Sequence, residues 1–253
     1  MKVTFLGTGT SQGVPVITCE CRVCRSNDPK DKRLRVSIHI DYQGRSLVVD
    51  TGPDFRQQIL RAGITELHAV LMTHEHKDHT AGMDDVRAFN FKYRKAMPVF
   101  ATPQVQQALK REFHYVFEEN PYPGVPQIEL VDIGTETFDC LGLQVTPIEV
   151  MHYRLPVLGF RIADFAYITD AKTISEQEAE KLFGLDVLVL NALRRKDHIS
   201  HLTLEEALEW IDRFRPKRAY LTHISHLMGK HADIEQLLPP HVHLASDGLR
   251  IEV

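Results

Sequence analysis

A dense group of histidine and acidic side chains follows an apolar run that predicts a buried strand (residues 67–72). The group has the sequence His-Glu-His-Lys-Asp-His. Alternate residues of an extended turn point the same way, so His74 and His76 can hold one metal ion while Asp78 and His79 hold a second. Two ions about 3.5 to 4 Å apart can share one water and turn it into hydroxide at neutral pH. A lone histidine is more often a surface or packed imidazole, but this density predicts a two-metal hydrolytic centre.

The length and composition predict one α/β domain over residues 1–253. Apolar residues make up 43% of the chain, enough for a substantial core. The formal net charge of −4 argues against a surface that coats nucleic acid, whereas a small anionic substrate stays compatible because bound metals supply positive charge. No apolar stretch has the length of a signal peptide or a membrane span, so we expect a cytoplasmic protein with no membrane partner.

The pattern of apolar runs divides the chain into two similar halves. In the first half it predicts strands at residues 3–6, 36–42, 46–50, 68–72 and 99–101, and helices at 54–62, 84–91 and 103–116. In the second half it predicts strands at 143–149, 158–162, 165–169, 186–190 and 218–222, helices at 175–183 and from 204, and a closing hairpin-like pair at 243–246 and 249–253. Thr203 and Glu206 have capping-box spacing, which marks the start of the last helix. Two halves of strands with helices outside predict a four-layer αββα sandwich.

Further ligands for a pair of ions have to come from elsewhere in the chain. His152, Asp170 and His223 each stand just past a predicted strand, where loops converge on one rim of a sandwich. Any one of them alone is as readily a buried, hydrogen-bonded side chain as a ligand. Their order and spacing together favour the metal site.

The motif and the three distal residues resemble the metallo-β-lactamase superfamily over essentially the whole chain. That resemblance implies an αββα sandwich with a dinuclear site. The ligands of the first metal would be His74, His76 and His152. The ligands of the second would be Asp78, His79 and His223. Asp170 would bridge the two ions, and Asp50 matches an acidic position that orients the ligand loop. An aspartate bridge argues against antibiotic hydrolysis, because lactamases usually have Cys or Asn near these positions.

Three of the four cysteines lie within six residues. Cys19, Cys21 and Cys24 offer three thiolates, and a tetrahedral structural zinc needs one further ligand, for which His226 is the candidate. The alternative is a group of buried or oxidisable thiols without metal. Cys140 has no neighbouring cysteine and is expected in the core.

The cysteine motif, the sequence Thr-His-Ile-Ser-His and the segment 7–15 resemble the PhnP-type phosphodiesterases of phosphonate metabolism. This resemblance implies a structural zinc, a homodimer and a small or cyclic phosphodiester substrate such as 5-phosphoribosyl 1,2-cyclic phosphate. For the glycine-rich residues 7–13, a tight structural turn is expected rather than a phosphate-binding loop.

A departing alkoxide needs a proton or a charge partner. His201 aligns with the general acid of the PhnP-type enzymes, which together with Asp78 and Asp170 gives the predicted catalytic set; His198 is the alternative acid. Arg194 and Arg195, beside Lys196, are candidates for a substrate contact, although charge runs are usually only solvated. This segment departs from the PhnP pattern and leaves the substrate open.

Three other functions compete with the phosphodiesterase. A nuclease resembling tRNase Z shares the ligand set but normally carries an RNA-gripping arm, which this chain lacks. A thioester or lactone hydrolase of the glyoxalase type usually lacks the cysteine cluster. A non-catalytic metal-binding or interaction module on a former hydrolase scaffold commonly loses ligands, whereas every expected ligand is present here. The His and Asp ligands accept zinc, manganese and iron, so the two active-site ions are expected to be zinc or manganese, with one further structural zinc.

Overall fold

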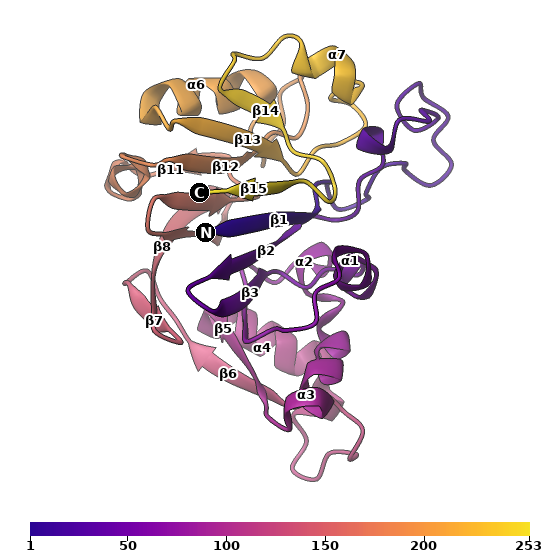
Figure 1. Cartoon of the computed structure of the whole chain (residues 1–253), viewed down its shortest axis with the longest axis vertical. Coiled ribbons are helices and arrows are strands. Elements are labelled where there is room, and N and C mark those ends of the chain that lie inside the picture. The colour runs from indigo at the N-terminus through magenta and orange to yellow at the C-terminus, as the bar shows by residue number, and fades with distance from the viewer.

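The computed structural model describes residues 1–253. Two β-sheets lie face to face, with helices on the outer side of each (Figure 1). The first sheet contains, in spatial order, β15 (Arg250–Glu252), β1 (Lys2–Gly7), β2 (Ser37–Tyr42), β3 (Arg45–Val49), β4 (Ala69–Leu71), β5 (Met97–Ala101) and β6 (Ile128–Asp132). The second contains β11 (Thr173–Ile174), β8 (Leu143–His152), β9 (Leu155–Ile162), β10 (Phe165–Ile168), β12 (Val187–Asn191), β13 (Arg218–Thr222) and β14 (Val242–Leu244), with β7 (Phe138–Cys140) paired to β8.

Helices cover the outer faces of both sheets. Those of the first half are α1 (Phe55–Ala62), α2 (Lys77–Thr80), α3 (Arg87–Tyr93) and α4 (Pro103–Glu112). Those of the second half are α5 (Glu176–Ala179), α6 (Leu204–Phe214) and α7 (His231–Glu235). Short 3-10 helices lie at Pro29–Asp31, Met83–Val86, His114–Val116 and Glu180–Leu182. The predicted four-layer αββα sandwich is confirmed. None of the helices combines the length and the apolarity that a membrane span requires.

Three apolar layers hold the four structural layers together. Phe5, Ile38 and Tyr167 belong to the layer between the two sheets. A second layer, which includes Phe55, packs the first sheet against α1, α3 and α4, and a third, which includes Phe214, packs the second sheet against α5 to α7. The central strands are apolar on both faces because each face is covered.

The predicted closing hairpin is wrong. β14 pairs in parallel with β13 in the second sheet, whereas β15 pairs antiparallel with β1 in the first. The chain between them therefore crosses from one sheet to the other, and the backbone hydrogen bond from Phe5 N to the Leu249 carbonyl secures the crossing. Two short strands close in sequence looked like a hairpin because pattern alone does not specify the partner strand.

Several element boundaries also differ from the prediction. β6, β7, β11 and α7 were not predicted, because each is short and lacks a strong period. The short helix α2 was not predicted either: the motif was expected to be an extended turn, but Asp78 and His79 lie on this helix. The predicted helix 103–116 ends as α4 at Glu112 and continues as a separate 3-10 turn, and the predicted helix 175–183 is the four-residue α5 followed by another such turn. The capping box of α6 is confirmed: Thr203 Oγ1 accepts from Glu206 N, and the Glu206 carboxylate accepts from Thr203 N.

The sheet topology decides where the site lies. β3, β4, β5 and β6 run in parallel, and so do β10, β12, β13 and β14. The carboxyl ends of parallel strands share one edge of a sheet. Residues that follow β3, β4, β10 and β13 therefore meet at one edge of the sandwich.

Candidate metal centres

The side chains of the His-Glu-His-Lys-Asp-His motif gather just after β4. His74 Nε2 lies 3.0 Å from His76 Nδ1, and the ring centroids of His74 and His79 are 4.1 Å apart. Two imidazole nitrogens on one tetrahedral zinc are separated by about 3.3 Å. The first pair of histidines is therefore spaced to share one ion.

The distal residues join this cluster from the second sheet. The His152 ring centroid lies 5.3 Å from that of His76. Asp170 Oδ2 lies 3.3 Å from His79 Nε2, and Asp170 Oδ1 lies 3.3 Å from His223 Nε2. The fold thus brings all seven predicted ligands together, while their role in binding metal stays a prediction.

Asp170 occupies the centre of the cluster. Its carboxylate lies within 4.8 Å of the ligand nitrogens of His74 and His79, and also of those of His152 and His201. Asp78 forms a further group with His79 and His223. A carboxylate shared between neighbouring groups is the arrangement that a bridging ligand requires.

Unpartnered nitrogens show what the cluster fits. His79 Nε2 and both ring nitrogens of His223 are buried and form no hydrogen bond. Buried polar atoms normally have a partner, because leaving one unsatisfied costs free energy. Nitrogen and carboxylate donors that converge without partners suit divalent cations such as zinc.

A buried network sets which nitrogen of each ring faces the cluster. Asp50 Oδ2 lies 2.7 Å from His79 Nδ1 and 2.8 Å from Thr73 Oγ1, and Thr73 Oγ1 lies 3.0 Å from His74 Nδ1. His152 Nδ1 donates to the Ser200 carbonyl at 2.9 Å. Because Nδ1 of these three rings is occupied by an acceptor, Nε2 is the nitrogen that faces the cluster and can bind an ion. Asp50 lies where the sequence predicts it, whereas Thr73 was missed, although it directly precedes the motif.

Backbone conformation aims several of these side chains. Asp50, Asp170 and His223 have φ angles of 63°, 58° and 55°. Such values are uncommon for residues other than glycine, and they cluster at functional sites. Asp50 and His223 directly follow strands β3 and β13, and Asp170 lies two residues after β10. The unusual backbone conformation at these three positions turns each side chain into the site.

Close backbone packing fixes the ligand loop. A Cβ at Gly52 would lie 2.1 Å from the Asp78 carbonyl oxygen, and a Cβ at Gly82 would lie 2.2 Å from the Gly52 carbonyl oxygen. Side chains cannot be accommodated at these distances. The two glycines let the segment after β3 support the helix that carries Asp78 and His79.

Charges and burial act against each other in this cluster. Burial and the neighbouring His79 hold the pKa of His74 well below its usual value. Burial opposes ionisation of Asp170, but the facing His223 and His79 outweigh it and hold the pKa of Asp170 well below the ordinary value. Burial also opposes a charge on His79, but Asp170, Asp50 and Asp78 outweigh it and hold the pKa of His79 well above its ordinary value. The site therefore offers an ionised carboxylate beside a neutral His74, and a metal ion would displace a proton from His79.

The predicted general acid lies on the rim of the cluster. The His201 ring centroid lies 4.5 Å from that of His152 and 4.9 Å from that of His223, and its Nδ1 is buried without a partner. Burial and then His223 lower the pKa of His201 to about 2. His198 lies one step further out, 5.1 Å from His201 between ring centroids.

The cysteine arm forms a second donor group. The Sγ atoms of Cys19, Cys21 and Cys24 lie 3.2, 3.4 and 3.6 Å from His226 Nδ1. A sulfur and a nitrogen bound to one tetrahedral zinc are about 3.5 Å apart. Burial opposes ionisation of Cys21, but hydrogen bonds from the Cys24 backbone and from His226 lower the pKa of Cys21 to about 6. A thiolate is therefore available at neutral pH. The four donors fit one tetrahedral ion.

The remaining predicted residues are placed as follows. Arg194 and Arg195, with Lys196, line an open cavity next to the His201 loop. Cys140 is fully buried in the layer between the sheets. The amides of Gly9, Thr10, Gly13 and Val14 donate to backbone carbonyls, so the structure favours a structural turn over an anion-binding loop.

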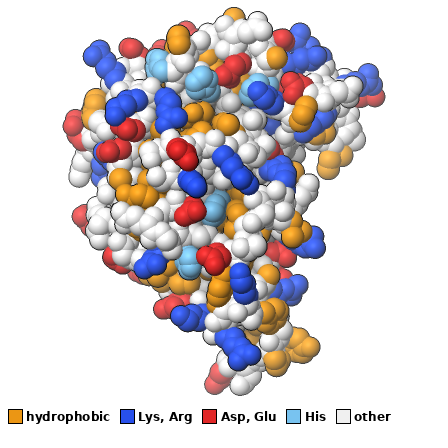
Figure 2. Space-filling view, in the orientation of Figure 1, with side chains coloured by type: hydrophobic (Ala, Val, Ile, Leu, Met, Phe, Trp, Pro, Cys, Tyr) orange, Lys and Arg blue, Asp and Glu red, His pale blue; other side chains and the backbone are white.

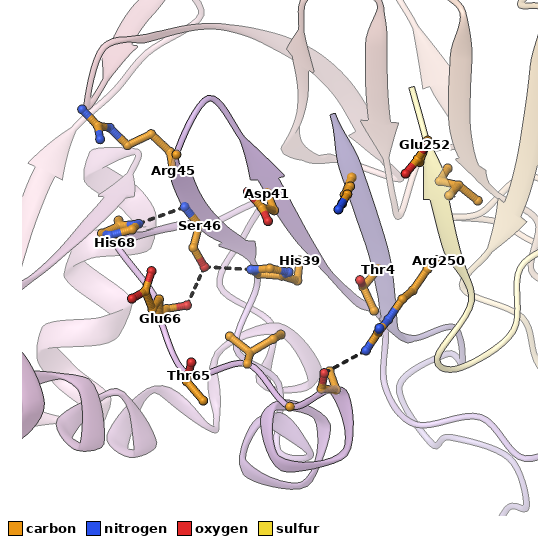
Figure 3. Close-up of a pocket in the computed structure, with 16 residues that line it drawn as sticks. Thr4, His39, Asp41, Arg45, Ser46, Thr65, Glu66, His68, Arg250 and Glu252 are labelled. Carbon is orange, nitrogen blue, oxygen red and sulfur yellow. Dashed lines mark hydrogen bonds between the residues drawn. The ribbon is translucent and has the colours of Figure 1, made fainter.

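A separate polar cavity of about 640 Å³ lies on the outer face of the first sheet (Figure 3). His39, Ser46 and His68 form its hydrogen-bonded floor, with Ser46 Oγ 2.8 Å from His39 Nε2 and Ser46 N donating to His68 Nδ1 at 2.9 Å. The cavity contains none of the predicted site residues.

The family comparison points to one superfamily. A family model described as "Beta-lactamase superfamily domain" matches residues 45–224. This range includes every predicted ligand of the two-metal cluster.

The chain also resembles individual proteins. It is 43% identical over 252 residues to an octanoyltransferase of Porphyromonas gingivalis, covering 98% of this chain but only 51% of that protein. The chain thus spans about half the length of this relative. The crystal structure of a "new diphosphatase from the PhnP family" is 38% identical, covers 100% of this chain and 97% of that one, and has a TM-score of 0.93. Zinc-bound PqqB from Methylobacterium extorquens is 20% identical with full coverage of both chains and a TM-score of 0.81, which shows the shared fold.

Proposed function

Because this chain belongs to the metallo-β-lactamase superfamily and is a metal-dependent hydrolase, we propose that it hydrolyses a P–O bond in a small phosphodiester. In this proposal two divalent ions, zinc or manganese, occupy the cluster around Asp170. His74, His76 and His152 bind one ion, and Asp78, His79 and His223 bind the other. Cys19, Cys21, Cys24 and His226 bind a structural zinc.

The placement of Asp170 is the observation that carries the proposal. Its two carboxylate oxygens lie 3.3 Å from His79 Nε2 and from His223 Nε2, and the same carboxylate reaches the groups that contain His74 and His152. One anionic ligand between two sets of imidazoles suits two ions held side by side. The similarity to a PhnP-family diphosphatase supports phosphorus rather than carbon as the centre attacked.

Two bound ions in such a site supply an activated water and neutralise charge on phosphoryl oxygens. The protein's own residues do the rest. Asp50 and Thr73 hold the ligand rings in the productive tautomer and orientation. His201 faces the departing oxygen and provides its proton.

The low pKa of His201 has a consequence for this step. A neutral imidazole still carries one N–H, which donates a hydrogen bond to the departing oxygen. The negative charge of a bound phosphodiester raises the proton affinity of the neighbouring ring, because an opposite charge favours the protonated form. In this proposal the charge of the substrate acts on the His201 ring in the direction that proton transfer requires.

The surface is consistent with a small substrate. Figure 2 shows Lys and Arg side chains interspersed with Asp and Glu on one face of the molecule. Electrostatic binding of a long polyanion requires a continuous basic surface. A small diester needs only the metal ions and the nearby cations of the His201 loop.

Hydrolysis of bis(p-nitrophenyl) phosphate by protein reconstituted with zinc or manganese tests the proposal, beside Asp78→Ala as the matched variant. We expect turnover that depends on metal and falls by at least about 10²-fold in the variant. Cyclic ribose phosphates and dinucleotide diphosphates then define the substrate.

The same assay decides among the competing activities. An acyl thioester belongs in the substrate set, because one relative is named an octanoyltransferase, and a precursor tRNA tests the nuclease. Thioester or tRNA cleavage without any phosphodiester turnover, in protein with metals demonstrably bound, would reject the proposed function.

A further inference from the structure

Three consecutive cations line one cavity beside the His201 loop. Arg194, Arg195 and Lys196 surround about 590 Å³ together with Leu227. None of the three cations forms an ion pair, because the adjacent acid, Asp197, pairs with Lys172 Nζ at 3.0 Å. The cavity therefore carries uncompensated positive charge in a protein whose net charge is −4.

The base of this cavity is fixed by hydrogen bonds. Arg194 donates from Nε to the Lys196 carbonyl at 3.1 Å and from Nη2 to the Asp197 carbonyl at 2.6 Å. The preceding residue, Leu193, bonds through its backbone to Leu202 and Ser225. These bonds support the backbone that carries Arg195 and Lys196, which reduces the entropic cost of ordering that backbone on binding.

The position of the loop relates the cavity to the chemistry. His201 lies against the metal cluster, and the ring centroid of His198 lies 5.1 Å from that of His201. Arg194 belongs to the same loop and is close enough to His198 for its charge to act on that ring. A general acid stands beside the departing oxygen. A cavity beyond it on the same loop therefore lies on the side of the departing group, away from the part of the substrate that remains on phosphorus.

Resting on the proposed function, we propose that this cavity binds an anionic group carried by the departing alcohol of the substrate. Arg195 and Lys196 contact the anion, Arg194 supports them through the loop, and Leu227, which is 55% exposed, packs against the organic body. Water adds to phosphorus, the P–O bond to the alcohol breaks, and the alcohol leaves with the proton and its anionic group. A carboxylate or a phosphate monoester supplies the required charge.

Four nitrophenyl diesters separate the position of the charge from its nature. The reference is methyl 4-nitrophenyl phosphate. The second carries a carboxylate on the departing nitrophenol, the third carries a carboxylate on the retained alkyl group, and the fourth carries a phosphate monoester on the departing group. We expect kcat/KM to exceed the reference by about tenfold or more for the second and fourth compounds and not for the third, since a charge-assisted hydrogen bond contributes at least this much.

A double variant and a matched control assign the effect. Arg195→Gln with Lys196→Gln should reduce the ratio between charged and reference diesters to near one. The control is Arg94→Gln with Lys95→Gln, which removes the same two residue types from the exposed segment between α3 and β5 of the first sheet. The control should keep the full ratio.

The outcomes separate this inference from the proposed function. Turnover of the reference diester with no preference for a charged departing group would overturn the inference and leave the phosphodiesterase intact. An equal preference for the third compound would also overturn the inference, because the cavity would then bind the group that remains on phosphorus. Calorimetric binding of the free carboxylated nitrophenol gives a test that needs no turnover: the inference requires weaker binding to the double variant than to the control.

Discussion

Asp50 Oδ2 lies 2.7 Å from His79 Nδ1, and neither side chain is exposed to solvent. The same carboxylate oxygen accepts the Thr73 hydroxyl, and its other oxygen accepts Thr73 N at 2.9 Å. One buried carboxylate thus orients two consecutive parts of the ligand loop. The proposed metal site would depend on side chains that do not touch the metal.

Thr73→Val removes the hydroxyl that connects Asp50 to His74 without changing the side-chain size. We expect a loss of about 10- to 100-fold in metal affinity or in kcat/KM. Metal titration and activity measure the loss, and Thr73→Ser should retain most of both. An unchanged metal affinity in Thr73→Val would show that His74 is oriented by packing alone.

Gly52→Ala should displace the ligand loop, because its Cβ would lie 2.1 Å from the Asp78 carbonyl oxygen. We expect loss of at least one equivalent of active-site metal together with most of the activity. Gly134→Ala is the control, since a Cβ there meets nothing within 4 Å. Elemental analysis of the purified variants measures the metal, and wild-type content in Gly52→Ala would contradict the packing argument.

His201→Gln separates proton transfer from substrate binding. Diesters with alkyl leaving groups should lose about 10²-fold or more in kcat, because a poor leaving group needs a proton. p-Nitrophenolate leaves without one, so its loss should be much smaller. If His198→Gln shows this leaving-group dependence and His201→Gln does not, the assignment of the general acid passes to His198.

Cys24→Ser tests the structural zinc. We expect the zinc content to fall by one equivalent, and the thermal midpoint to fall by about 6 °C or more, because zinc binding contributes to folding. Cys140→Ala is the matched cysteine control, since Cys140 is buried far from His226 in sequence and in the layer between the sheets. Differential scanning calorimetry and elemental analysis give both values. Equal zinc in Cys24→Ser and wild type would reject the site.

His39 makes a pH-dependent contribution to stability. Burial lowers its pKa from 6.5 to about 4, and its Nε2 lies 2.8 Å from Ser46 Oγ (Figure 3). Between pH about 6.5 and about 4 the unfolded chain binds more protons at this residue than the folded chain does. The stabilisation present above this range is therefore lost as the pH falls, by about 2 kcal/mol at pH 5.

His39→Gln keeps a hydrogen-bonding side chain but does not titrate. Urea unfolding at pH 7.5 and pH 5 should show a smaller loss of stability on acidification for this variant than for wild type. Equal losses in the two proteins would mean that His39 is solvated and that other groups set the acid sensitivity.

Much of this protein is determined locally in its sequence. The spacing within residues 74–79 predicted a cluster of ligand side chains because residues close in the chain have few relative orientations, and the structure brings these side chains together. The capping box at Thr203 and the αββα layering followed from local hydrogen bonding and hydrophobic period, and the structure confirms both. These features depend on residues close in the chain, where pattern and geometry are directly linked.

The tertiary structure decided the rest. It placed β14 and β15 in different sheets, because strand partners are chosen by packing between distant segments and not by the strands' own pattern. It joined Thr73 to the site through Asp50, a residue 23 positions away. It also paired Asp197 with Lys172 and so left the cations of the His201 loop without a counter-charge. Hydrogen bonds and ion pairs between distant residues form only after the chain has folded, so sequence spacing alone does not reveal them.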